Sequence, residues 1–147
     1  MYNYIGEEST LPVDPTGNDL KQFLANDPGG PVVMLNLLRF EPGKREGYEE
    51  YSRRIRPFLD EMGASVLYVG ECSSLLVGPE SHRWDAVLLV RYPSRQAFSS
   101  MVADPKYQEI TGMRTEALED AVLQATIPWP DDAPDMPGEQ GEAGAGT

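Results

Sequence analysis

The longest apolar run of the chain, Pro31 to Phe40, has a pattern that predicts a strand buried on both faces. From Val32 to Leu38, apolar side chains stand at odd and even positions alike, and Asn36 is the one exception. A strand with one face in water would instead alternate apolar and polar residues. Gly29-Gly30 before the run and Pro42-Gly43 after it favour a central strand over a buried helix.

Two polar residues of this run fall on opposite faces of the predicted strand. Asn36 shares a face with Leu38, and Arg39 shares the other face with Leu37. A buried amide without a partner costs about 1–3 kcal/mol, and a buried guanidinium needs a partner or access to water. Each residue is therefore either a paired structural group or part of a cavity wall. Unless a bulge intervenes, at most one of them faces a pocket on the helix side of the sheet.

The remaining periodicities predict four helices and three further strands. Apolar residues recur at helical spacing over 16–26, 45–62, 95–103 and 105–121. Ser94 and Asp104 are good N-caps for the last two helices, and Pro57 is expected to kink the second. Apolar runs predict strands over 65–71, 84–92 and 123–127. We expect Leu75-Leu76-Val77 to extend the first of these strands after a bulge around Cys72.

After the first helix, the order of elements is strand, helix, strand, strand, helix, strand. This order is typical of the α+β ferredoxin-like fold, βαββαβ, with the sheet in the order 4-1-3-2 and both helices on one face. The other face would then expose many large aliphatic side chains, each worth about 1.5–3 kcal/mol when buried. We therefore expect a homodimer in which two sheets pack face to face, although a different partner chain would satisfy the same requirement.

Composition sets the domain organisation and excludes several classes of partner. With 147 residues, the chain predicts one domain over 16–127, an irregular arm over 1–15 and a disordered acidic tail over 128–147. The net charge of -12 argues against nucleic acid and anionic membrane surfaces as partners. No apolar run approaches the roughly 18 residues of a spanning helix, and the first residues lack a secretory signal pattern. A cytoplasmic location is expected.

Four stretches of the chain carry a family resemblance: Met34 to Phe40, Trp84 to Val87, Leu89 to Ser94, and Met101 to Tyr107. Together they resemble the domain of unknown function 1330 family, which belongs to the dimeric α/β-barrel superfamily. The resemblance covers about residues 16–127, and Arg114 with the Ala117-Leu118-Glu119-Asp120 run fits the family's later helix. Members often carry a His just before that arginine, where this chain has Met113.

The resemblance implies a homodimer of ferredoxin-like protomers, with sheets packed face to face in a dimeric α/β barrel. It also implies a pocket between the sheet and the helices. Relatives in the superfamily include cofactor-independent monooxygenases, cyclases, isomerases and haem-dependent enzymes. The fold does not choose among these activities.

The sequence offers few means of holding a metal or a cofactor. One His and one Cys cannot form a His or Cys metal cluster, and no glycine pattern for a nucleotide loop is present. We therefore expect no metal site and no cofactor. Haem would require His82 or Cys72 as an axial ligand, and nothing in the sequence favours either. Cys72 has no sequence-near base and is expected to be an inert thiol.

Candidate catalytic residues are Asn36 and His82, the side chain with an unperturbed pKa nearest neutrality. His82 lies in a predicted loop, where it is either a solvated side chain or, if the loop folds over a pocket, a general base. Five further residues are candidates for substrate binding: Arg39, Tyr48, Tyr51, Arg91 and Arg114.

Each substrate-binding candidate also has a structural explanation. Arg39 could pair with Asp85, and the two tyrosines could be core aromatics. Arg114 falls in an otherwise apolar helical stripe, so it either reaches solvent or binds something anionic, such as a carboxylate, an enolate or a phenolate.

Two functions of different classes fit these residues. The first is a small cofactor-independent enzyme, of the monooxygenase, isomerase or cyclase type that the resemblance implies, acting on a hydrophobic oxygenated or anionic metabolite. Asn36 and an arginine would polarise a carbonyl or hold an enolate, and His82 or a tyrosine would move the proton. The second is a non-catalytic ligand-binding or dimerisation module with a packed interior. A cavity larger than one or two water molecules distinguishes the two.

Overall fold

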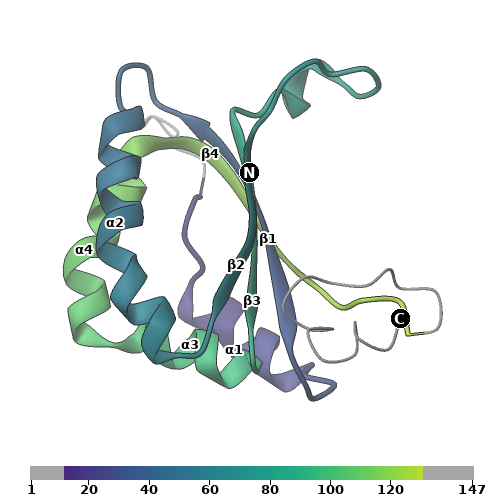
Figure 1. The fold of residues 1–147 in the computed structure, drawn as a ribbon, viewed down its shortest axis with the longest axis vertical. Helices are drawn as coiled ribbons and strands as arrows, with labels where there is room; N and C mark the ends of the chain where they lie inside the picture. Colours follow the sequence, from purple (N-terminus) through teal and green to yellow (C-terminus); the bar gives the residue numbers. More distant parts are fainter. Residues whose placement is uncertain (1–11, 131–147) are drawn as a thin grey trace, which may run out of the picture.

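The computed structural model describes residues 12–130, which form a four-stranded antiparallel sheet covered by helices (Figure 1). The elements in chain order are α1 (Gly17–Ala25), β1 (Val32–Phe40), α2 (Arg45–Glu61), β2 (Ser65–Glu71), the short 3₁₀ helix η1 (Glu80–His82), β3 (Ala86–Tyr92), α3 (Arg95–Ala103), α4 (Pro105–Ala117) and β4 (Leu118–Thr126). The predicted arm and tail lie outside the described residues except for 12–15 and 128–130.

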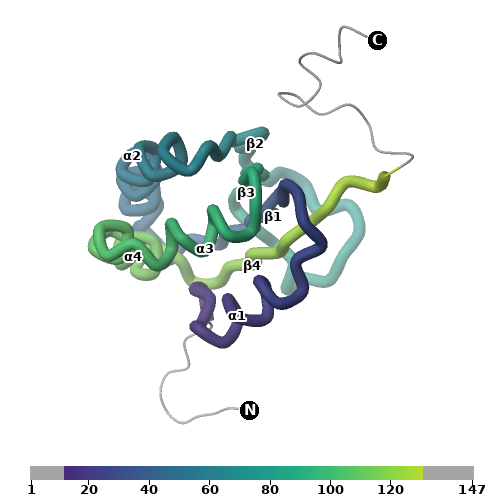
Figure 2. Tube along the Cα trace, turned by 90° about the horizontal axis from the view of Figure 1, so that it is seen from below, coloured from purple at the N-terminus to yellow at the C-terminus, as the bar shows by residue number. Residues whose placement is uncertain are grey.

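The sheet confirms the predicted ferredoxin-like topology. Its strands lie in the order β2-β3-β1-β4, and β1 and β3 form the central antiparallel pair, with Asn36 opposite Leu88. Figures 1 and 2 both show α2 and α4 on one side of the sheet. α1 packs on α3, with the rings of Phe23 and Phe98 meeting edge to face at 5.6 Å.

Side-chain caps begin α1, α3 and α4, and those of α3 and α4 are the two that the sequence predicts. Ser94 Oγ accepts the N–H of Ala97 at the start of α3, and Asp104 accepts the N–H of Lys106 at the start of α4. Thr16 and Asp19 form a reciprocal capping box at the start of α1. Such caps satisfy N–H groups that the first helical turn leaves without partners.

The predicted boundary between the last helix and the last strand is wrong. The helix was expected over 105–121, but α4 ends at Ala117 and β4 begins at Leu118. Ala121, Leu123 and Ala125 alternate along the chain, so a strand places all three against the helix-covered core. Residues from Leu118 onward therefore pair with β1 as a strand, although the spacing of Leu118 and Ala121 also fits a helix.

The predicted extension of β2 through Leu75-Leu76-Val77 is also wrong. These residues belong to a loop, and Leu76 and Val77 are 90% and 91% exposed. Glu71, the last residue of β2, pairs with Ala86, the first residue of β3. Beyond that pair, the N–H of Cys72 donates to the carbonyl oxygen of Asp85 at 2.9 Å, and the chain then leaves the sheet before it reaches Leu75.

The core lies between the helices and the side of the sheet that faces them. Leu38, Met101 and Val32 are its most completely buried large side chains. The opposite side, which we call the outer face, carries Leu35 and Leu37 of β1 and their partners on neighbouring strands. No helix within the described part of the chain is both long and apolar enough to span a membrane.

Replacing Leu38 with alanine should lower the free energy of unfolding by about 2–5 kcal/mol, because the side chain is fully buried (0% exposed) and its removal leaves a cavity. Urea unfolding monitored by circular dichroism measures this change. Leu76→Ala is the matched control, since a leucine that is 90% exposed should change stability by less than about 0.5 kcal/mol. Equal effects of the two substitutions would contradict the assigned core.

Candidate functional site

A cavity of about 480 Å³ lies between the sheet and the helices. The sheet contributes Met34, Asn36 and Leu88, and α2 and α4 contribute Tyr48, Tyr107 and Arg114. Exposed side chains such as Glu49 also line it, so the cavity is open to solvent. A volume of this size is typical of small-molecule sites and contradicts a fully packed interior.

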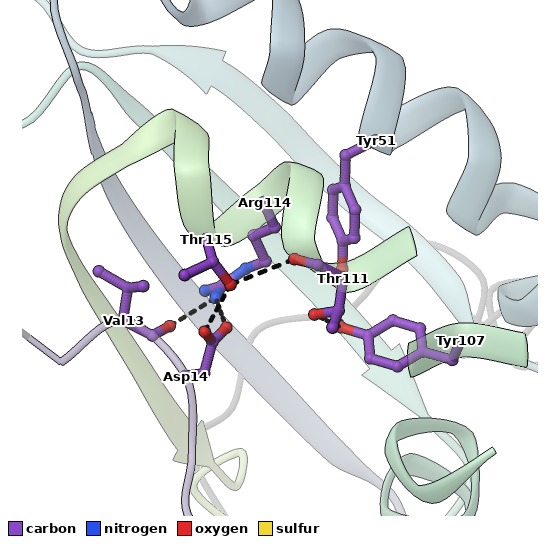
Figure 3. Close-up of polar contacts among 7 residues, drawn as sticks. All are labelled: Val13, Asp14, Tyr51, Tyr107, Thr111, Arg114 and Thr115. Carbon is purple, nitrogen blue, oxygen red and sulfur yellow. Dashed lines mark hydrogen bonds and ion pairs between the residues drawn. The ribbon is translucent and has the colours of Figure 1, made fainter. Parts of the chain in front are cut away.

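Arg114, in the last turn of α4, is the most deeply buried charged group of the cavity wall. Its side chain is 6% exposed. Nη1 donates to the carbonyl oxygen of Val13 and to Oδ1 of Asp14, the latter at 2.7 Å (Figure 3). Nη2 is buried and has no hydrogen-bond partner among the described residues. A buried donor without an acceptor costs about 1–3 kcal/mol, so an acceptor oxygen placed at Nη2 would be stabilising.

The partner of Arg114 comes from the segment before α1, residues 12–15, which we call the N-terminal arm. The arm passes along the gap between α4 and the sheet (Figure 1), and Asp14 and Pro15 form part of the cavity wall. Asp14 Oδ2 also accepts the hydroxyl of Thr115 at 2.6 Å. Residues 12–15 belong to no helix or strand, and Arg114 and Thr115 hold this part of the arm in place.

Buried tyrosines surround the same space. The hydroxyls of Tyr51 and Tyr107 are 2.9 Å apart, and Thr111 donates to the Tyr107 hydroxyl at 3.4 Å (Figure 3). Burial raises the pKa of Tyr48, Tyr51 and Tyr92, and the charge of Arg114 offsets this only in part. These hydroxyls are therefore neutral hydrogen-bonding groups at physiological pH.

Of the two polar residues in the central strand, Asn36 is the one that faces the cavity. Its Nδ2 makes one long contact, 3.4 Å, to the carbonyl oxygen of Met34. A contact of this length is near the limit for a hydrogen bond. The carboxamide of Asn36 can therefore bond to a molecule in the cavity.

Arg39 faces the other way and does not line the cavity. Its guanidinium pairs with Asp120 at 3.2 Å, donates to the carbonyl oxygens of Arg83 and Ser81, and lies 4.6 Å from the ring centre of Trp84. The expected partner, Asp85, instead accepts the backbone N–H of Phe40. β4 supplies the carboxylate because Asp120 stands directly opposite Arg39 in the sheet.

The structure also leaves Arg91 and His82 outside the cavity. Arg91 stands opposite Val33 on the outer face. His82 ends the exposed helix η1, so the loop does not fold over the cavity in the single chain. Of the residues predicted from the sequence, Asn36, Tyr48, Tyr51 and Arg114 meet in one place, and Arg39, Arg91 and His82 do not.

Two important wall residues were absent from the predicted site. Tyr107 precedes Arg114 by seven residues on α4, so its helical spacing is a signal that could have included it. Asp14 had no such signal, because its contact with Arg114 joins residues that are 100 positions apart. Among residues 12–130, no three His, Cys, Asp or Glu side chains are grouped so as to hold a metal ion.

The raised pKa values of the buried tyrosines predict a loss of stability in alkali. Because each hydroxyl has a higher pKa folded than its ordinary value of 10.0, the stabilisation is complete below that pH and is lost as pH rises above it. Urea unfolding measured at increasing pH should show this loss, and Tyr51→Phe should reduce it. Tyr68→Phe, at a side chain that is 56% exposed, should not. An identical pH dependence in all three proteins would contradict this assignment.

Comparison with known proteins gives a family and a fold. The family model described as a domain of unknown function (DUF1330) matches residues 36–125. A protein of unknown function from Rhodopseudomonas palustris, RPA0582, is 37% identical with a TM-score of 0.75, over 80% of this chain and 96% of that one. A dabb family protein with a ferredoxin-like fold from Mesorhizobium loti is 9% identical with a TM-score of 0.52, over 69% of this chain and 99% of that one.

No curated protein matches the chain. The Mesorhizobium loti structure is too distant in sequence to show more than the fold, whereas the Rhodopseudomonas palustris protein is similar along most of the chain. The family model spans more than half of the sequence and includes Asn36, Tyr48, Tyr51 and Arg114. The chain therefore belongs to the DUF1330 family, as its sequence resemblance predicts, and has the ferredoxin-like α+β fold.

Proposed function

We propose that this protein binds a largely hydrophobic, oxygen-bearing small molecule in the cavity and acts on it as a small enzyme without a bound metal. One observation carries the proposal: Nη2 of Arg114 is buried and has no hydrogen-bond partner within residues 12–130, on a side chain that lines a cavity of about 480 Å³. Aromatic and aliphatic side chains supply most of the remaining wall, which suits a hydrophobic body. An acceptor oxygen on that body would satisfy Nη2.

The arrangement favours chemistry at a carbonyl group. Donors that point at a carbonyl oxygen stabilise the negative charge that develops there during enolisation, isomerisation or cyclisation. Arg114 supplies a charged donor from α4, and Asn36 supplies an amide from the sheet. The neutral tyrosines would orient the molecule. The wall contains two carboxylates, Asp14 and Glu49, either of which could accept a proton.

A non-catalytic ligand-binding module is the second candidate. The hydroxyls of Tyr51, Tyr107 and Thr111 bond to one another, as expected of polar groups that only complete a wall. The two functions differ in the fate of the ligand. A binding module returns it unchanged, whereas an enzyme converts it.

We also propose that the protein is a homodimer that forms through the outer face. Leu35 and Leu89 pair across β1 and β3 on that face, and Leu37 pairs with both Val87 and Val122. All five are only partly buried in the single chain, and Tyr68 of β2 beside them is 56% exposed. A continuous apolar sheet face of this kind is typical of an interface, and a second copy supplies a matching face by two-fold symmetry.

Arg114→Lys tests the cavity. Lysine keeps the positive charge beside Asp14 but cannot reproduce the second guanidinium nitrogen. Binding of 2-acetylnaphthalene, a hydrophobic aromatic ketone, should weaken by about tenfold to a hundredfold, the equivalent of one hydrogen bond to a charged donor. Isothermal titration calorimetry measures the change. Native mass spectrometry of freshly purified protein provides a second test, because a retained ligand should be lost in the variant.

Arg95→Lys is the matched control for this substitution. Arg95 is also largely buried and, like Arg114, donates to a backbone carbonyl, that of Phe23, and lies near a carboxylate, Asp27. It does not line the cavity, so binding should stay at the wild-type level. The cavity proposal fails if the ketone does not bind, or if both lysine variants bind it equally well.

The dimer has a separate test. Light scattering at micromolar concentration should give about twice the chain mass of 16.3 kDa. Leu89→Asp should reduce the mass to that of one chain, because it places a charge at the centre of the outer face. Gln22→Asp, on the exposed side of α1, should leave the mass doubled. A wild-type mass of 16.3 kDa would refute the homodimer.

A further inference from the structure

We infer that the N-terminal arm makes the cavity selective for neutral molecules: Asp14 compensates the charge of Arg114, so Nη2 donates a hydrogen bond to a neutral carbonyl oxygen in preference to a carboxylate. The inference rests on the proposed function and narrows the substrate class from oxygenated or anionic to neutral and carbonyl-bearing. It concerns a residue, Asp14, that lies ahead of the matched family region.

The contacts of Arg114 divide its guanidinium into two ends. Nη1 is occupied by the arm, through the carbonyl oxygen of Val13 and Oδ1 of Asp14. Nη2 is buried and has no partner among the described residues. The carboxylate of Asp14 therefore balances the positive charge of the guanidinium, while Nη2 can still donate a hydrogen bond to a ligand.

An anion and a neutral acceptor respond differently to such a group. A carboxylate bound at Nη2 would lose its hydration, and the negative charge of Asp14 at Nη1 would offset part of the attraction that Arg114 exerts on it. A ketone or ester oxygen loses much less hydration and still receives a bond from a charged donor. The compensated arginine therefore favours the neutral molecule.

The other charges of the wall do not restore an anion site. Arg45 binds Glu71 at 2.8 Å and Glu49 at 3.4 Å, so carboxylates already surround it. Arg56 lines the cavity from an exposed position, where water and salt screen its charge. Arg114 is the buried cation of the cavity wall that could bind an anion strongly, and its charge is already paired with Asp14.

Asp14→Asn removes the negative charge while keeping the shape of the arm. The amide oxygen can still accept from Arg114, and the amide nitrogen can donate to the hydroxyl of Thr115. Arg114 then carries an uncompensated charge next to its free nitrogen. The variant should gain more affinity for a carboxylate than for a ketone, because the carboxylate carries a net charge that the uncompensated arginine attracts.

The experiment compares two probes of similar shape, 2-acetylnaphthalene and 2-naphthoate, by isothermal titration calorimetry on the full chain. The wild type should bind the ketone at least about tenfold more tightly than the carboxylate. Asp14→Asn should raise the affinity for 2-naphthoate by about tenfold or more. Asp14→Glu, which keeps the charge, should retain the preference of the wild type. The control Asp27→Asn, which removes the matched carboxylate beside Arg95, should also retain it.

Three results would overturn the inference. If the wild type binds 2-naphthoate as tightly as the ketone, the charge of Arg114 is not compensated. If Asp14→Asn leaves the affinity for 2-naphthoate unchanged, Asp14 does not set the selectivity. In both cases the cavity still binds ligands and the proposed function stands. If neither probe binds to any of the four proteins, the proposed function fails and the inference fails with it.

Discussion

A buried guanidinium needs a negative charge or hydrogen-bond acceptors beside it, and in this protein that requirement connects three parts of the chain. Arg114 lies at the end of α4, its carboxylate partner Asp14 lies in the arm before α1, and both line a cavity whose floor is the central sheet. If Arg114 were absent, the described arm would lose its contacts through Nη1, and only the bond from Thr115 to Asp14 would hold its carboxylate. Arg114 therefore anchors the arm through Nη1 and is also a candidate for ligand binding through Nη2.

The chemistry proposed for the cavity follows from the limits of its side chains. The buried tyrosines hold their protons because burial raises their pKa values, so they can orient a molecule but cannot act as bases near neutral pH. His82 lies on an exposed loop away from the cavity. The wall still offers the charged donor Arg114, the amide of Asn36 and the carboxylates of Asp14 and Glu49, within a mostly apolar lining. This set is suited to polarising a carbonyl group and moving a proton beside it.

The two faces of the sheet have different roles. The helix-covered face provides the core and the cavity, and its deepest residues, Leu38 and Val32, belong to the central strand. The outer face carries aliphatic side chains that the described elements cover only in part. Arg39 and Asn36 show the division clearly. They are three residues apart in β1. Arg39 pairs with Asp120 away from the cavity, and Asn36 faces the cavity. The alternation of a strand gives them these opposite roles.

The sequence by itself determined the family, the order of elements, the central pair of strands and the N-caps, because these depend on local periodicity and on turn residues. It also predicted four residues that line the cavity: Asn36 and Arg114, which are polar groups within apolar stripes, and the inward-facing Tyr48 and Tyr51. Only the tertiary structure decided that Asn36 and not Arg39 faces the cavity, that Arg39 pairs with Asp120, and that β4 begins at Leu118. The bond between Asp14 and Arg114 spans 100 positions, and no local pattern specifies a contact between residues that only the folded chain brings together.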